Sequence, residues 1–109
     1  MVFVLGLSAC SGSPFGKVNY LDGYPTLADG GWVNVVVEIP SGINEKWEVD
    51  KTSSTLHPEH KGERPRVIKY LSYPGNYGII PRTSLPRELG GDGDPLDVLL
   101  LGPRLVGAR

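Results

Sequence analysis

The 109-residue sequence has little of three features that many binding proteins depend on. It contains a single cysteine, Cys10, which excludes an intrachain disulfide and a zinc site built from several cysteines. Aromatic residues make up 8% of the chain, and the formal net charge is −1. Because binding to nucleic acid through its phosphates needs a basic surface, the composition argues against DNA and RNA as partners. It also argues against a barrel module that binds oligonucleotides or sugars on exposed aromatic rings.

Glycine and proline are abundant, with 15 and 10 residues, and they leave little room for long helices. A β-rich fold is therefore favoured, and the length is that of one small domain. We place this domain at residues 32–109. Residues 11–31 mix glycine, serine, proline and aspartate without any period, which is typical of a linker rather than of a core element.

The start of the chain resembles a bacterial lipoprotein signal. Leu7-Ser8-Ala9-Cys10 follows an apolar stretch and is similar to a lipoprotein cleavage box, which would anchor the protein to a membrane through Cys10. A secretory signal needs a positively charged start, and none precedes this stretch. The first nine residues are also too short to span a bilayer. Residues 1–31 therefore stand as a lipoprotein-like signal remnant and linker, with a coincidental match as the alternative.

The hydrophobic pattern predicts five strands. Residues 32–39 are rich in β-branched side chains and end at Pro40, so we expect a largely buried strand with Glu38 as its one charged member. Charged and apolar residues alternate over 46–50, which places Trp47 and Val49 on one face of a strand. The remaining expected strands are 66–73, 77–80 and 98–101, the last of them buried, and 52–65 is expected to be a loop.

Three aspartates, Asp92, Asp94 and Asp97, stand close together before the last strand. The glycine and proline between them favour a tight bend. Two unit charges about 4 Å apart repel by roughly 1 kcal/mol in water and roughly 4 kcal/mol at an effective dielectric constant of 20. We therefore expect raised pKa values or a bound cation. Carboxylates without thiolate or imidazole partners select Mg²⁺, Mn²⁺ or Ca²⁺.

Two other interpretations of the acidic cluster compete with this metal site. An EF-hand needs glycine at loop position six and glutamate at position twelve, but counted from Asp92 those positions hold Asp97 and Pro103. The cluster also leads into a strand rather than a helix, so an EF-hand is rejected. A solvated acidic turn on the surface stays open.

Four blocks of sequence in order resemble the family of soluble inorganic pyrophosphatases. They are Val36 to Pro40, Lys46 to Asp50, Tyr73 to Gly78 and Asp92 to Val98, and the last matches the family signature at every position. The resemblance covers residues 32–103. It implies a β-rich α+β fold with a closed barrel like the oligonucleotide-binding (OB) fold, and several Mg²⁺ ions at the barrel mouth. It also implies hydrolysis of pyrophosphate to two phosphates by a homo-oligomeric, cytoplasmic enzyme.

The resemblance implies a role for each acidic residue that matches. Asp92 and Asp97 would bind the metal pair that holds the attacking water. Asp94 would be the general base or would orient that water. Glu38 would belong to the outer group of metal ligands, and Glu48 would support the charged side of the site.

The resemblance also implies a set of phosphate-binding residues. Lys46, Arg66 and Tyr77 would bind phosphate oxygens, and Tyr73 would line the site. The spacing from the arginine to the tyrosine motif is one residue shorter than we expect, so Arg64 competes with Arg66 for this role.

The chain ends at Arg109, whereas the family continues through further metal-binding and phosphate-binding residues. We therefore expect an incomplete barrel, weak Mg²⁺ binding and little or no activity from these 109 residues by themselves. One alternative is a non-catalytic, envelope-anchored remnant of the fold. The other is an OB-type binding module.

Overall fold

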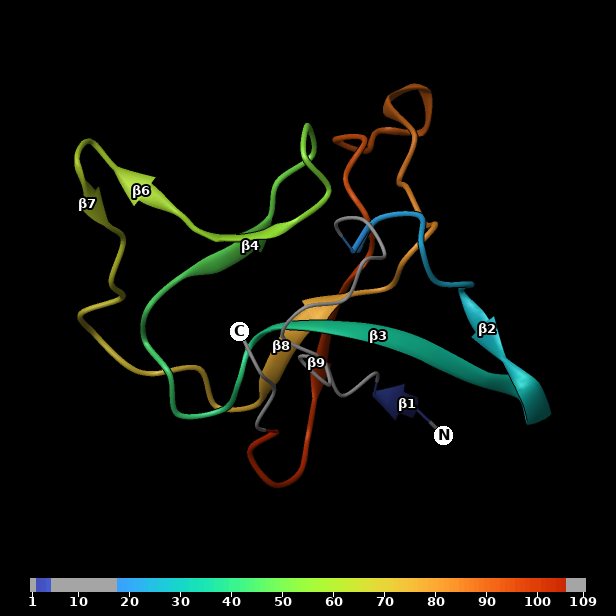
Figure 1. Cartoon of the computed structure of the whole chain (residues 1–109), viewed down its shortest axis with the longest axis horizontal. Coiled ribbons are helices and arrows are strands. Elements are labelled where there is room, and N and C mark those ends of the chain that lie inside the picture. The colour runs from blue at the N-terminus through green and yellow to red at the C-terminus, as the bar shows by residue number, and fades with distance from the viewer. Residues whose placement is uncertain (1, 5–17, 106–109) are drawn as a thin grey trace.

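The computed structural model describes residues 2–4 and 18–105, and they form almost only strands and loops (Figure 1). The described residues contain two short 3-10 turns and no α-helix, so the helical part of the expected α+β class is absent from them. We also find among them no helix with the length and apolar character of a membrane span. In chain order the elements are β1 (Val2–Val4), β2 (Leu27–Ala28), η1 (Asp29–Gly31), β3 (Trp32–Ile39), β4 (Trp47–Val49), β5 (Leu56–Pro58), β6 (His60–Lys61), β7 (Arg64–Pro65), β8 (Asn76–Ile79), η2 (Arg87–Leu89) and β9 (Asp97–Leu100).

The long strand β3 is the centre of the main sheet. β1 pairs with its first half in parallel, β2 pairs with the same half antiparallel, and β8 pairs with its second half antiparallel. β9 pairs with β8 and forms one edge of the sheet in the described part of the chain. The described residues therefore form an open five-stranded sheet, and they do not form the closed barrel that the resemblance implies.

Two small sheets lie beside the main one (Figure 1). β4 pairs with β5, and β6 pairs with β7 in a tight hairpin. The expectation of a loop over 52–65 is thus wrong, because β5, β6 and β7 all fall inside it.

The strand expected over 66–73 is also wrong. In its place the structure has a single β-bridge between Glu45 and Val67. The backbone of Arg66 and Ile68 forms hydrogen bonds with the 44–46 segment, and the chain then bends away at 69–70. Its apolar side chains therefore have no sheet to join.

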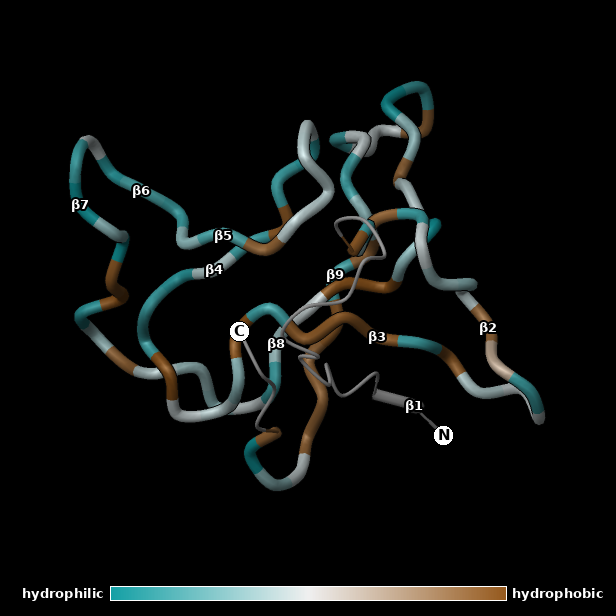
Figure 2. Tube along the Cα trace, in the orientation of Figure 1, coloured by the Kyte–Doolittle hydropathy of each residue, from teal (hydrophilic) through white to brown (hydrophobic). Residues whose placement is uncertain are grey.

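The buried core is small and lies between β3, β4 and β8. Val36, Val49 and Ile79 are buried together, and Leu56, Tyr20 and Leu21 pack against them. Figure 2 shows that hydrophobic residues are concentrated along β3 and β9, whereas the β6–β7 hairpin is mostly hydrophilic.

The segment from 18 to 31 takes part in this core, although its composition predicts only a linker. It supplies Tyr20 and Leu21 to the core and β2 to the sheet. Cys10 and the lipoprotein-like box lie outside the described residues.

The last strand, β9, is only half covered. The strand expected over 98–101 is confirmed as β9, but Leu99 is 46% exposed and Leu101, just after the strand, is 84% exposed, so the expectation that this strand is buried is wrong. Burial alternates along β9, as it does when only one face of an edge strand meets the core.

Asn76 ties three segments together at the start of β8. It is 1% exposed, and its side-chain oxygen accepts hydrogen bonds from the backbone N–H groups of Ser41 at 3.1 Å and Leu105 at 2.9 Å. Its side-chain nitrogen donates to the Pro103 carbonyl at 3.0 Å. The loops that follow β3 and β9 are therefore fixed to the strand that carries Tyr77.

Candidate active site

Glu38 lies in a β-bulge near the end of β3. Val37 faces Gly78 and Ile39 faces the adjacent Tyr77, so Glu38 is the extra residue between two paired positions. Bulges redirect side chains and are frequent next to active sites. The strand predicted over 32–39 is confirmed, and the bulge explains how a charged residue comes to be buried within it.

Glu38 is only 6% exposed, and its Oε1 accepts a hydrogen bond from the Val49 backbone N–H at 2.7 Å. Burial raises the pKa of Glu38 to about 7, and the nearby carboxylates of Asp97 and Glu48 also act to raise it. The Val49 bond and the Lys46 ammonium act in the opposite direction. This side chain therefore lies within electrostatic reach of three other predicted site residues.

Tyr77 and Asp97 lie on the neighbouring strands β8 and β9. Burial raises the pKa of Tyr77 above its ordinary value, and a hydrogen bond with the Asp97 carboxylate raises it again. The ring of Tyr73 packs against that of Tyr77, with centroids 5.3 Å apart and planes at 51°. Tyr77 is thus held as a neutral hydroxyl that donates hydrogen bonds.

Lys46 and Arg66 meet at one carboxylate. Lys46 Nζ lies 2.6 Å from Glu59 Oε2, and Arg66 Nη1 lies 2.7 Å from Glu59 Oε1. Tyr73 and Glu48 are also close enough to Arg66 to raise its pKa, after the larger effect of Glu59. Arg64 instead stands opposite Lys61 in the β6–β7 hairpin.

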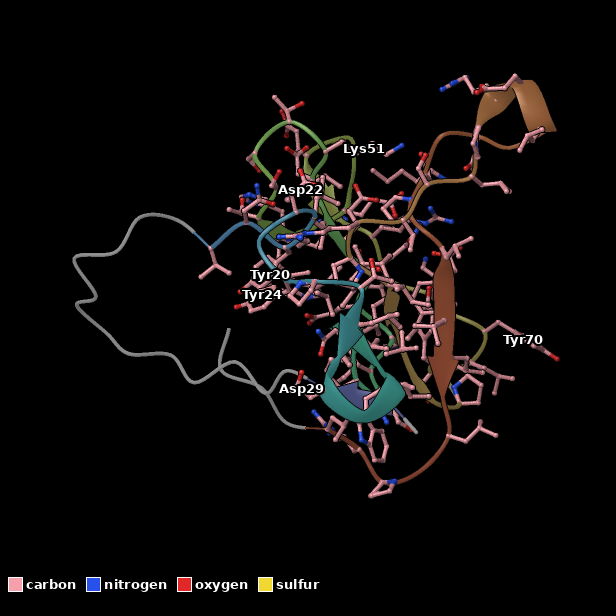
Figure 3. The ribbon with its side chains drawn as sticks, turned by 90° about the vertical axis from the view of Figure 1, so that its right-hand side faces the viewer. Tyr20, Asp22, Tyr24, Asp29, Lys51 and Tyr70 are labelled. Carbon is pink, nitrogen blue, oxygen red and sulfur yellow. The ribbon has the colours of Figure 1, made fainter. Side chains whose placement is uncertain are left out.

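Asp92 and Asp94 lie in the loop before β9, where the Asp92 side chain contacts the Asp94 backbone and the Asp94 side chain contacts Lys51. Asp92 Oδ1 accepts a hydrogen bond from the Asp94 backbone N–H at 2.9 Å. Asp94 forms an ion pair with Lys51 from the turn between β4 and β5, and Figure 3 shows the Lys51 side chain extending from that turn. Gly93 has φ +83°, a conformation that glycine adopts without strain, and this permits the bend between the two aspartates.

The structure therefore gathers most of the predicted residues but not all. An electrostatic and contact network joins one group of them, which consists of Glu38, Lys46, Glu48, Arg66, Tyr73, Tyr77 and Asp97. Asp92 and Asp94 make their contacts on the Lys51 side. Among the described residues no three acidic, histidine or cysteine side chains lie close enough together to hold a metal ion. Mutual repulsion of carboxylates gives a physical reason for this separation.

Two residues in this region were not predicted from the sequence to belong to the site. Glu59 stands in a polar stretch, 13 positions after Lys46 and 7 before Arg66, and Lys51 is 43 positions from Asp94. No periodicity links residues at such separations. A lone charge is also an ordinary surface feature, so only the paired strands could show these contacts.

A comparison with models of protein families matches residues 35–108 to the family described as inorganic pyrophosphatase. The chain belongs to the inorganic pyrophosphatase family. The matched residues contain every candidate site residue from Glu38 to Asp97. The family membership expected from the four sequence blocks is therefore confirmed.

Curated proteins give the same family. The chain is 42% identical over 75 residues to an inorganic pyrophosphatase of Mesorhizobium japonicum, which covers 68% of the chain and 37% of that protein. It is 46% identical over 72 residues to an inorganic pyrophosphatase of Saccharolobus solfataricus, with coverage of 64% and 35%. It is 45% identical over 69 residues to a soluble inorganic pyrophosphatase of Oryza sativa subsp. indica, with coverage of 62% and 27%. The chain thus spans about a third of the length of these pyrophosphatases.

Proposed function

We propose that this protein hydrolyses inorganic pyrophosphate to two phosphates with the help of divalent cations, Mg²⁺ above all. The observation that carries the proposal is the match of residues 35–108 to the inorganic pyrophosphatase family. The geometry supports it, because the carboxylates of Glu38 and Asp97 lie beside Tyr77, and Lys46 lies within reach of Glu38. Negative groups for cations and donors for phosphate oxygens therefore meet in one region.

The chemistry of the donor set fits a hard divalent cation. Asp92, Asp97 and Glu38 offer only carboxylate oxygens, which suit Mg²⁺ and Mn²⁺. Burial is the main cause of the raised pKa of Glu38, and the charges of Asp97 and Glu48 add to it, so a cation bound beside this carboxyl would favour its ionised form. When bound, such ions lower the pKa of a coordinated water and neutralise the departing phosphate.

The side chains of the chain itself have two tasks in the proposed reaction. Asp94 accepts the proton of the attacking water or orients that water. Lys46, Arg66 and Tyr77 bind phosphoryl oxygens and oppose the charge that spreads over them. Tyr73 keeps the Tyr77 ring in place by packing, and Glu48 adds negative charge beside Glu38.

The position of the arginines favours Arg66 over Arg64 in this proposal. Arg66 is joined to Lys46 through Glu59, and it lies near Tyr73. Arg64 faces another cation, Lys61, across the hairpin.

Four finer features belong to the proposal through the family resemblance alone. They are a closed OB-like barrel domain that begins at residue 32, a homo-oligomeric assembly, a cytoplasmic location, and Mg²⁺ as the preferred ion. Anchoring to the cell envelope through Cys10 is the alternative location.

The test measures phosphate release from pyrophosphate in the presence of Mg²⁺. Because the chain matches 37% of the Mesorhizobium japonicum relative, the assay uses the chain itself and a fusion in which it replaces the matching part of that relative. We expect the fusion to release phosphate. We expect Asp92→Asn, Asp94→Asn and Asp97→Asn each to lower kcat/KM by about 100-fold or more, the usual scale for an essential acid or base.

Asp29→Asn is the matched control, since Asp29 is an exposed aspartate in η1, and it should leave the rate unchanged. Normal hydrolysis by all three aspartate variants would contradict the proposed site. A folded fusion that releases no phosphate would favour the non-catalytic remnant.

A further inference from the structure

Three separate segments converge at Glu59 through their backbones. The Lys46 N–H donates to the Arg66 carbonyl at 2.9 Å, and the Arg66 N–H donates to the Glu59 carbonyl at 2.7 Å. The Glu59 N–H donates to the Lys46 carbonyl at 2.8 Å, which closes a ring of three hydrogen bonds. The relative positions of the three backbones are therefore set by main-chain hydrogen bonds and do not depend on the side chains.

The side chains repeat the arrangement around one carboxylate. Glu59 forms an ion pair with Lys46, whose Nζ lies 2.6 Å from Oε2, and another with Arg66, whose Nη1 lies 2.7 Å from Oε1. Only 22% of the Glu59 side-chain surface is exposed. The two cations hold the pKa of Glu59 below its ordinary value, with Lys46 as the larger cause. Glu59 is thus an ionised bridge between two positive side chains that would otherwise repel each other.

The contact leaves the other donors of Arg66 available. Glu59 occupies Nη1, and Nε and Nη2 make no hydrogen bond with any described residue. These two nitrogens form a planar fork that matches two oxygens of one phosphoryl group. Lys46 keeps further ammonium donors because an ammonium group carries three.

We propose that Glu59 is a positioning residue that holds Lys46 and Arg66 as one preassembled clamp for the phosphoryl groups of pyrophosphate. The inference rests on the proposed function, in which these two cations bind the substrate. Free lysine and arginine side chains lose much rotamer freedom when they close on a ligand, and a bridge that has already ordered them removes part of that cost. Glu59 therefore acts on substrate affinity and does not touch the reacting atoms.

The main alternative is that Glu59 only stabilises the β6–β7 region. The two roles differ in what happens once the clamp is gone. A positioning residue has no further effect on affinity when Lys46 and Arg66 are absent, whereas a residue that supports the local fold still has one.

The binding test uses the 109-residue chain with Mg²⁺ and the non-hydrolysable analogue imidodiphosphate, measured by calorimetry. Glu59→Gln keeps the size and the backbone bonds, and we expect it to weaken binding by about tenfold, the scale for two side chains that must be ordered anew. Glu59→Asp, which keeps the charge but has a shorter reach, should fall between Glu59→Gln and the unsubstituted chain. Glu63→Gln removes the same charge from the turn of the hairpin, where Glu63 makes no ion pair with a described residue, and should have no effect.

A double-mutant cycle completes the test. In a Lys46→Met/Arg66→Met background, Glu59→Gln should change the affinity by less than about twofold. In the fusion protein, Glu59→Gln should raise KM by about tenfold and leave kcat within about threefold. Circular dichroism of each variant confirms that it is folded.

The outcomes separate the two proposals. Binding that depends on Glu59 in a protein that does not hydrolyse pyrophosphate would support the clamp and contradict the proposed function. Hydrolysis with a KM that Glu59→Gln does not change would contradict the clamp alone. Equal losses of affinity in the presence and absence of Lys46 and Arg66, or no binding of the analogue by the unsubstituted chain, would also overturn it.

Discussion

Glu38 places an acid inside the core at the point where β3 bulges. The pKa of this carboxyl is about 7 in the folded chain, because burial opposes its ionisation, whereas the ordinary value is 4.5. The folded protein therefore keeps a proton that the unfolded chain releases between these two values. Its contribution to the free energy of unfolding must fall as the pH rises through this window.

We predict that Glu38→Gln stabilises the chain at high pH when divalent ions are absent. The amide can still accept the Val49 N–H bond but has no charge to bury. We expect urea denaturation in EDTA to show that the difference in free energy of unfolding between the variant and the unsubstituted chain grows by about 2 to 3 kcal/mol from pH 5 to pH 8. This size follows from the shift in the pKa of Glu38.

Glu63→Gln provides the comparison, since Glu63 is exposed in the turn of the β6–β7 hairpin and is not among the groups that shift the pKa of Glu38, and it should leave the pH dependence of stability unchanged. Parallel pH profiles for the Glu38 variant and the unsubstituted chain would show that the buried acid does not destabilise the fold.

At the scale of elements, the site depends on how closely β8 approaches β3. A Cβ atom on Gly78 would lie 2.0 Å from the Val36 carbonyl oxygen, far inside a normal contact. Gly78 pairs with Val37 directly before the bulge, and the adjacent residue Tyr77 pairs with Ile39 directly after it. The glycine thus permits the strand spacing that brings Tyr77 and Glu38 together.

We predict that Gly78→Ala costs more stability than a glycine substitution in open space. Gly42 has φ +82°, and a Cβ atom added to it would meet no other atom within 4 Å, so Gly42→Ala should cost about 1 to 2 kcal/mol from backbone strain alone. Gly78→Ala should cost about 3 kcal/mol or more, because the two strands must separate. Urea denaturation of both variants compares the two costs, and an equal loss would mean that the close approach is not needed.

At the scale of the whole molecule, the β9 edge of the main sheet has no neighbouring strand in the described part of the chain. Among the described strands β9 pairs only with β8, and Leu99 on the strand and Leu101 just after it are exposed. An exposed apolar edge strand is a template for pairing with another chain. Tyr70 is also fully outside the core and, as Figure 3 shows, projects from its loop away from the rest of the ribbon.

We predict that the 109-residue chain associates through β9 at micromolar concentration. Leu99→Lys together with Leu101→Lys should shift the mass measured by light scattering toward that of a monomer, because charged side chains on an edge oppose strand pairing. Leu27→Lys on β2 is the control, since Leu27 is an exposed leucine on another strand of the sheet. A loss of association in the Leu27 variant alone would place the contact elsewhere.

The sequence by itself determined the elements whose pattern is local. The bounds of β3, the alternation around Trp47 to Val49 and the turn before Tyr77 follow from neighbouring residues, and so did the family, which rests on four short blocks of residues in order. The short strands β5, β6 and β7 were not predicted because runs of two or three residues are too short to show a periodicity.

Only the tertiary structure decided which charges meet. The bulge buries Glu38, the ring of backbone bonds brings Glu59 to Lys46 and Arg66, and the β4–β5 turn carries Lys51 to Asp94. These contacts join residues far apart in the chain, so they depend on strand register and loop closure and not on any local pattern. The order of the residues along the chain was therefore enough to identify the family, and the folding of the strands was needed to bring the charged side chains together.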